Sequence, residues 1–244
     1  MKLIKPSPAE NRIRKCIFLL FILMSILQFS RCYKDETPKP FPPVQHCPGI
    51  PIVEYEGEEY PTVLINNRCW LAKNLNIGTM LADCTQMTNN GIIEKYCYGS
   101  DSTNCDIYGG LYQWDEMMQY TNEEGFRGIC PGGWHIPTNR EFVELFLYCD
   151  DLWLYLITNL GGHWGSGFTN SEYHNLTGFS ALPGGWSWIE GDRYVNIHEK
   201  AGFWSSRSID DSVAIVFGLP DFIELDNQTF FKSAGFSVRC IKDE

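Results

Sequence analysis

Ten cysteines in a chain of 244 residues are the feature that most restricts how this protein can fold. Eight of them follow an N-terminal segment with the character of an export signal, and an even number of cysteines in an exported chain indicates disulfide bonds. A zinc site is the weaker interpretation, because the sequence has no CxxC pair and its five histidines are scattered. The eight cysteines are Cys47, Cys69, Cys84, Cys97, Cys105, Cys130, Cys149 and Cys240.

Residues 1–31 are predicted to be a signal peptide of the lipoprotein type. Several basic residues precede an apolar run at residues 16–29. A run of this length is too short to cross a membrane comfortably and is typical of the apolar core of a signal peptide. An uncleaved N-terminal anchor helix is the alternative interpretation.

The apolar run ends in Phe29-Ser30-Arg31-Cys32, which resembles a bacterial lipobox. In a lipobox the cysteine becomes the lipid-modified first residue, so we predict lipidation at Cys32 and attachment to a membrane through that lipid. Arg31 departs from the pattern, which prefers a small residue before the cysteine. Residues 33–36 resemble the acidic export tag of Bacteroidetes surface lipoproteins. The predicted location is therefore the cell envelope, as a surface-exposed outer-membrane lipoprotein.

The charge of the mature chain argues against nucleic acid as a partner. Without the signal peptide the chain keeps 13 basic and 29 acidic residues, a net charge of −16. Such a surface repels phosphate backbones. It also favours solubility outside the cell, so acidity alone does not indicate a cation site.

Composition along the chain predicts a tether followed by one domain. Residues 32–58 include four prolines within residues 37–43, which is typical of an extended, semi-rigid spacer. Residues 59–244 are predicted to form a single domain. Its aromatic residues, glycines and prolines favour short strands and many turns over a helix bundle.

Local patterns in that domain predict an α+β fold with two or three helices and short antiparallel strands. Two strand-like runs at residues 60–65 and 68–71 are separated by Asn66-Asn67, a pair that tolerates the positive φ of a tight hairpin turn. Thr138 followed by Glu141 predicts a capping box at the start of a helix. Further helices are expected at residues 111–119 and 152–160, and strands at residues 179–182, 194–197, 202–205, 213–217, 222–225 and 235–240.

Six motifs in order carry a resemblance to a known family. They are WLAKNL at residues 70–75, YCY with YGGLYQW at 96–114, CPGGWHIPT at 130–138, GFSALPGG at 178–185, WSS at 204–206 and GFSVRC at 235–240. Together they resemble the Fibrobacter succinogenes major paralogous domain over residues 59–244. That family is more distantly similar to the C-type-lectin-like fold of formylglycine-generating enzymes. The resemblance implies this fold and a secreted or lipid-anchored protein, and it implies no particular ligand.

Two disulfides can be assigned at this point. Cys97 and Cys105 are close in sequence and flank a polar turn, so we pair them. Cys130 and Cys240 both belong to family-like motifs, and the resemblance leads us to pair them as well. The four other cysteines of the domain then pair among themselves, or one or more of them stay free.

A cluster of aromatic and polar residues is the candidate ligand site. Two tryptophans, a tyrosine and three charged residues lie within nine positions, and sugar rings stack on exposed aromatic side chains. The bland alternative is that these rings fill the core. The predicted ligand-binding residues are Trp186, Trp188, Glu190, Asp192, Arg193 and Tyr194.

No pattern of catalytic residues stands out. The sequence lacks GxSxG, HExxH and a phosphate-binding loop, and no cofactor or metal is predicted. A formylglycine-generating enzyme needs a reactive cysteine pair near its C-terminus, but no cysteine lies between Cys149 and Cys240. We therefore expect a non-catalytic module that binds a glycan or a surface protein. The alternatives are a structural envelope lipoprotein and, less favoured, an enzyme of the formylglycine-generating type.

Overall fold

The hairpin expected at Asn66-Asn67 organises the first sheet of this computed structural model. The structure describes residues 41–82, 84–150, 152–158, 161–165, 174–188, 193–220 and 228–244. Both asparagines have positive φ, 48° and 61°, as a tight turn between twisted strands requires. The turn joins β2 (Glu58–Ile65) to β3 (Arg68–Leu71), so the predicted hairpin is confirmed.

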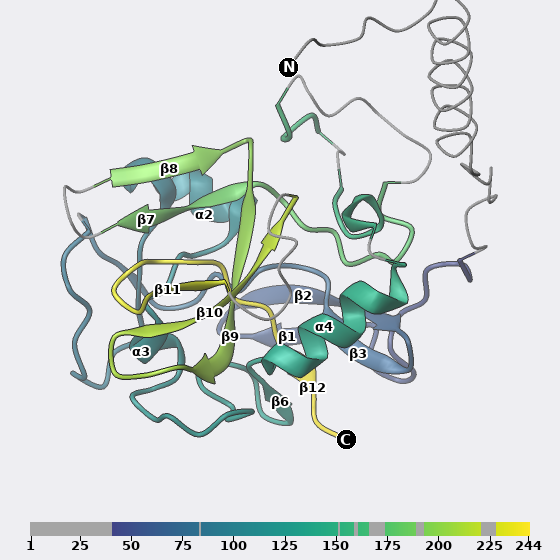
Figure 1. Ribbon diagram of the computed structural model, residues 1–244, viewed down its shortest axis with the longest axis horizontal. Helices are drawn as coiled ribbons and strands as arrows, with labels where there is room; N and C mark the ends of the chain where they lie inside the picture. The colour runs from purple at the N-terminus through teal and green to yellow at the C-terminus, as the bar shows by residue number, and fades with distance from the viewer. Residues whose placement is uncertain are drawn as a thin grey trace, which may run out of the picture. The chain divides into compact units, whose positions relative to one another are not determined.

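The first sheet joins both ends of the domain. Among the described residues it has five strands in the order β1-β2-β3-β12-β6 (Figure 1). Its other strands are β1 (Ile52–Tyr55), β6 (Trp134–His135) and the C-terminal β12 (Ile241–Lys242). All of its pairings are antiparallel.

The folded unit starts earlier than the sequence analysis predicted. Residues from Pro42 onward belong to one compact unit, and β1 pairs with β2 within the range expected to be tether. The proline-rich composition before residue 44 obscured this strand. The disulfide between Cys47 and Cys69 fixes the segment before β1 to β3.

The second sheet holds most of the C-terminal half. In the described ranges its strand order is β11-β10-β9-β7-β8. The pairing of β7 with β9 is parallel, as is that of the short strands β4 (Thr79–Met80) and β5 (Glu94–Lys95), so the expectation of purely antiparallel strands is corrected. The five strands are β7 (Gly184–Trp188), β8 (Arg193–Ile197), β9 (Ala201–Ser208), β10 (Val213–Leu219) and β11 (Thr229–Phe231).

Helix α4 (Asn139–Tyr148) packs between the two sheets. Thr138 and Glu141 form the predicted capping box at its start. Phe142 stacks on Phe217 of the second sheet at 4.7 Å between ring centroids and lies 5.5 Å from Trp70 of the first sheet. One buried helix face therefore joins the two sheets, and the fold class is α+β, as predicted.

The other helices among the described residues are short. They are η1 (Tyr98–Ser100), α2 (Ser102–Tyr108), α3 (Trp114–Met117) and η2 (Trp153–Tyr155). Of the helix expected at residues 152–160, the described residues 152–158 contain only the single turn η2, because Ile157 instead bridges Ala181 as extended backbone. The strand expected at residues 179–182 is likewise only this isolated bridge, and that at 222–225 lies outside the described residues.

The described part of the chain contains three disulfides. Two of them, Cys97–Cys105 and Cys130–Cys240, are the bridges assigned from the sequence. The third joins two of the cysteines left unassigned, Cys47 and Cys69. The last two cysteines, Cys84 and Cys149, are buried outside these three bridges. Within the described residues no helix is long and apolar enough to cross a membrane.

Candidate functional site

The β7–β8 hairpin carries the described part of the predicted ligand site. Its register pairs Trp186 with Val195, Ser187 with Tyr194 and Trp188 with Arg193. Residues directly opposite each other share a face, and neighbours along a strand alternate between faces. Trp186 and Trp188 therefore lie on one face, and Tyr194 lies on the other.

The first tryptophan belongs to the core. Trp186 is 7% exposed and stacks on Phe236 at 5.5 Å with 25° between the ring planes. It also contacts Phe230 at 5.8 Å. This agrees with the alternative in which the aromatic rings fill the core. The prediction that Trp186 belongs to an exposed ligand-binding platform is therefore wrong.

The second tryptophan belongs to a different surface from the one expected. Trp188 is half-buried and lies 5.7 Å from Phe230 and 6.3 Å from Phe231 between ring centroids. Phe231 is 56% exposed, and the exposed Arg193 lies opposite Trp188 in the hairpin. We call Trp188, Phe230 and Phe231 the aromatic strip.

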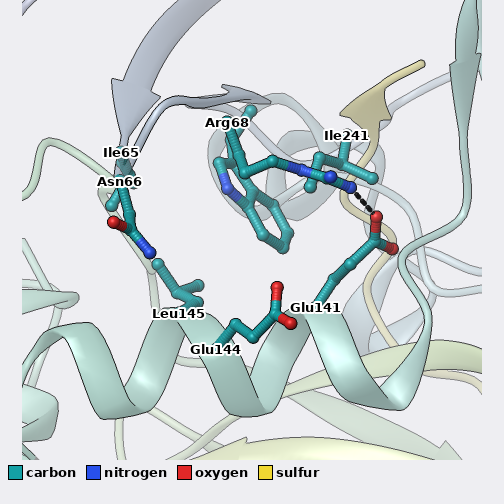
Figure 2. A pocket seen from close by; sticks show the side chains of 8 residues that line it. Ile65, Asn66, Arg68, Glu141, Glu144, Leu145 and Ile241 are labelled. Carbon is teal, nitrogen blue, oxygen red and sulfur yellow. Dashed lines mark hydrogen bonds and ion pairs between the residues drawn. The ribbon is translucent and has the colours of Figure 1, made fainter. Parts of the chain in front are cut away.

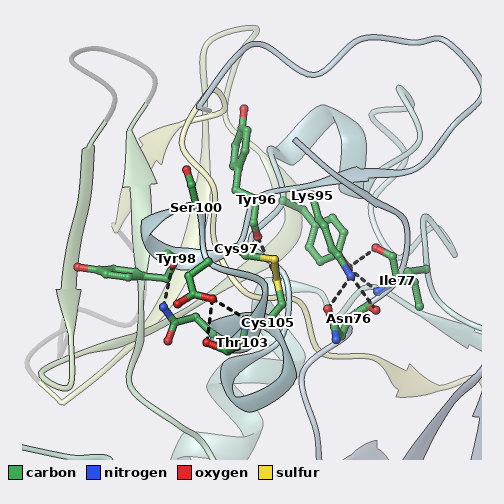
Figure 3. Close-up of a disulfide and its surroundings, with 12 residues drawn as sticks. Asn76, Ile77, Lys95, Tyr96, Cys97, Tyr98, Ser100, Thr103 and Cys105 are labelled. Atoms are coloured by element: carbon green, nitrogen blue, oxygen red, sulfur yellow. Dashed lines mark hydrogen bonds between the residues drawn. A yellow bond between two sulfur atoms is a disulfide. The ribbon is translucent and has the colours of Figure 1, made fainter. Parts of the chain in front are cut away.

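The opposite face of the hairpin packs on the Cys97–Cys105 loop (Figure 3). The ring of Tyr194 lies 5.2 Å from that of Tyr98, and its hydroxyl is 3.4 Å from the Ser100 hydroxyl. The disulfide closes the segment that carries Tyr98 and Ser100. Tyr194 therefore positions the hairpin on this loop and is separated from the aromatic strip by the hairpin itself.

The remaining predicted residues cannot be placed. Glu190, Asp192 and the lipidation site Cys32 lie outside the described residues. Their roles stay predictions.

A charged groove that the sequence analysis missed lies between α4 and the first sheet (Figure 2). Arg68 forms ion pairs with Glu141 of α4 and with Glu244 at the C-terminus. Figure 2 shows the apolar side chains of Ile65, Leu145 and Ile241 around these charges, and Trp70 of β3 lines the same hollow. A surface pocket of about 380 Å³ opens here, lined by Arg68, Thr138, Arg140, Glu141, Glu144 and Glu244.

His135 extends the same ion-pair network. Its two ring nitrogens lie 3.1 Å from Glu141 and 2.7 Å from Asp243. Burial disfavours the charged imidazole, but the hydrogen bonds to the two carboxylates outweigh burial and raise the pKa of His135. Burial also acts on Glu141, and the hydrogen bonds from His135 and Thr138 lower its pKa in spite of it. Because every charge here has a charged partner, the groove serves to hold α4 and the C-terminus together.

Comparison with known protein families places these features in one domain. Residues 63–242 match the Fibrobacter succinogenes major domain, which covers more than half of the chain. The chain belongs to this family. No curated protein and no solved structure matches the chain.

The Fibrobacter succinogenes major domain thus contains both faces of the hairpin, the aromatic strip and all of the groove except Glu244. Sequence reasoning found Trp188 and Arg193 because they lie in a dense aromatic and charged segment. It missed Phe230 and Phe231, which lie more than forty residues from Trp188 in the chain. Strands β11 and β7 are not neighbours in the second sheet, and the two rings lie near Trp188 because the segment after β11 returns to β7, where Gly235 bridges Ser187. Glu141 was interpreted as a cap only; it is a cap and also the centre of the ion-pair network.

Proposed function

We propose that this chain is an exported, lipid-anchored surface protein whose Fibrobacter succinogenes major domain binds a glycan at the aromatic strip without catalysing a reaction. The observation that carries the proposal is the position of Phe231, which is 56% exposed beside the half-buried Trp188. Large aromatic rings gathered at a surface typically mark a site of interaction.

The chemistry of the strip fits a neutral saccharide. The C–H faces of sugar rings pack on aromatic rings, while hydrogen-bonding groups at the edge select the hydroxyl pattern. The exposed Arg193 lies opposite Trp188 and supplies several donors. The mature chain is strongly acidic, which disfavours polyanionic ligands.

The proposed fold is C-type-lectin-like. Two arrangements support this proposal: the N-terminal β2–β3 hairpin and the C-terminal β12 belong to one sheet, and Cys130–Cys240 joins the segment before α4 to the end of the chain. In such an arrangement the second sheet and its loops are available for ligands. The aromatic strip lies on β7 and β11 of that second sheet.

The membrane attachment is tested at Cys32. We expect Cys32→Ala to abolish incorporation of labelled fatty acid and to release the protein from the membrane fraction. Continued labelling of that variant would contradict the anchor and leave the binding proposal standing.

Ligand binding is tested with a glycan array and whole cells, using the chain, a Trp188→Ala/Phe231→Ala variant and a matched control. Ile92→Ala is the control, because Ile92 is 57% exposed and outside the aromatic strip. Each lost ring contact should weaken binding by about 1 kcal/mol, or about five-fold. A folded double variant that binds like the parent and like the Ile92→Ala control would refute the strip as the ligand site. A parent that binds no glycan but captures a surface protein would favour the protein-binding alternative.

A further inference from the structure

Three side chains capable of binding a metal converge away from the aromatic strip. Tyr108 ends α2, His163 lies in the described segment 161–165, and His198 lies in the turn between β8 and β9. The Tyr108 hydroxyl oxygen is 3.2 Å from His163 Nδ1 and 3.3 Å from His198 Nδ1. His198 Nδ1 is also 2.8 Å from the His163 carbonyl oxygen. Two imidazoles, a phenol and a carbonyl therefore share one small volume.

The spacing of these atoms matches that of ligands around a metal. Four ligands placed tetrahedrally about 2.0–2.1 Å from an ion lie about 3.3 Å from each other. The two distances from the Tyr108 oxygen have this value, whereas the His198–carbonyl distance is shorter by half an ångström.

Positive φ angles and a backbone hydrogen bond hold the chain around the cluster in this arrangement. His198 has a φ of 67°, in the left-handed region that non-glycine residues rarely adopt. Gly161 has a φ of 88°, and a Cβ there would lie 2.7 Å from His163 Nε2. The Gly165 amide donates to the His198 carbonyl at 2.7 Å, which ties the two histidine-bearing segments together. Strained residues held in place by their surroundings are concentrated at functional sites.

We infer that Tyr108, His163 and His198 form a binding site for a divalent transition-metal ion. Imidazole nitrogens suit zinc, nickel and copper, and Cu²⁺ is the tightest of the divalent ions at such a nitrogen and oxygen set. The site has two histidines, and Tyr108 is the third side-chain donor, since its hydroxyl oxygen lies 3.2 Å and 3.3 Å from the two Nδ1 atoms.

The hydrogen bonds of the cluster indicate which nitrogen of His198 carries the proton before an ion binds. A carbonyl oxygen only accepts, so His198 Nδ1 carries the proton that it donates to His163. The Tyr108 hydroxyl forms a hydrogen bond with His163 Nδ1. To bind an ion through both Nδ1 atoms, His198 would carry its proton on Nε2 instead of Nδ1. A neutral phenol is a weaker ligand than an imidazole nitrogen, so the two histidines should provide most of the affinity.

The test is titration of the full-length chain, purified in detergent, with Cu²⁺ and with Zn²⁺. Calorimetry gives the stoichiometry, and electron paramagnetic resonance of bound Cu²⁺ reports coordination by imidazole nitrogen. We expect one ion per chain, a loss of at least about ten-fold in affinity for His163→Ala and for His198→Ala, and a smaller loss for Tyr108→Phe. His46→Ala is the matched control, because its ring bonds the Thr62 carbonyl outside the cluster, and it should bind as the parent does.

The titration distinguishes a metal site at these residues from its absence. Absence of saturable binding by the parent would overturn the site, as would a folded His163→Ala/His198→Ala variant that keeps the parent's affinity or its nitrogen signal. Where an alanine variant does not fold, His163→Asn and His198→Asn replace it, because asparagine retains a planar polar group of similar position. The result does not depend on glycan binding, so it stands or falls separately from the aromatic strip.

Discussion

Replacing Arg239 with methionine should be one of the most damaging single changes in the core. The guanidinium is 1% exposed and donates to four neutral acceptors. Its Nε bonds the Asn74 amide oxygen at 2.5 Å, Nη1 bonds the carbonyls of Leu71 at 2.8 Å and Phe179 at 2.6 Å, and Nη2 bonds that of Ser180 at 3.0 Å. Burial lowers the pKa of Arg239 to about 9, so it remains protonated near neutral pH.

The magnitude follows from what methionine leaves behind. Its side chain fills a similar length but donates no hydrogen bond, so three backbone carbonyls and one amide oxygen lose this donor in a buried position. Removing one partner from a buried charged network typically costs about 3–5 kcal/mol. Relief from burying a charge without a carboxylate offsets part of this, and we expect about 3 kcal/mol in the free energy of unfolding. For a domain of this size that corresponds to a fall of roughly 6–12 °C in Tm.

The assay is urea unfolding followed by tryptophan fluorescence, with the disulfides intact. Arg140→Met is the matched control, because its side chain is 86% exposed and pairs with Glu144 at the surface, and it should leave the stability nearly unchanged. Arg239→Lys keeps the charge but not the planar set of donors, so it should fall between the two. An Arg239→Met variant that loses no more stability than the Arg140→Met control would refute this account of the buried guanidinium.

The remaining predictions concern the disulfides and pH. Removing Cys130–Cys240, whose cysteines are 110 positions apart, should lower the free energy of unfolding by about 4–5 kcal/mol. Removing Cys97–Cys105, with a separation of 8, should lower it by about 2.5 kcal/mol. Urea unfolding of the two double-alanine variants checks this order, and an equal or reversed order would contradict it. The pKa of His135 is raised above the ordinary 6.5, so its contribution is fully present below pH 6.5 and is lost as the pH rises through the folded value. His135→Gln should therefore destabilise the fold more at about pH 5.5 than at about pH 8.5, and a loss that is the same at both would contradict the assigned charge.

Features set by neighbouring residues were predictable from the sequence. The Asn66-Asn67 turn and the capping box of Thr138 and Glu141 each depend on a few consecutive residues whose conformational preferences act locally. The bridge between Cys97 and Cys105 is also local. In all three cases the chain can satisfy the pattern without help from distant segments.

The face on which each hairpin ring lies could not be predicted. Trp188 pairs with Arg193, so even-numbered residues of β7 share a face with odd-numbered residues of β8. A shift of one position would have placed Tyr194 beside the tryptophans. The density of aromatic and charged residues in this segment does not by itself determine the register of the hairpin.

The charged groove depends on contacts between distant parts of the chain. Arg68 and Glu141 are separated by 73 positions, and Arg68 and Glu244 by 176. Their proximity follows only from the pairing of β3 with β12 and the packing of α4. No local pattern in the sequence carries that information.

The Cys47–Cys69 bridge has a mechanical consequence for a chain held at its N-terminus by the proposed lipid. Tension along the chain reaches Cys47 and passes through the disulfide to Cys69 on β3. The edge strand β1 lies inside the covalent loop of 22 positions that the tension bypasses, so it cannot be peeled away from β2. The load falls instead on β3, which is flanked by β2 and β12, and several backbone hydrogen bonds must break together before it moves. The bridge thereby moves the load from the edge strand of the first sheet to one of its interior strands.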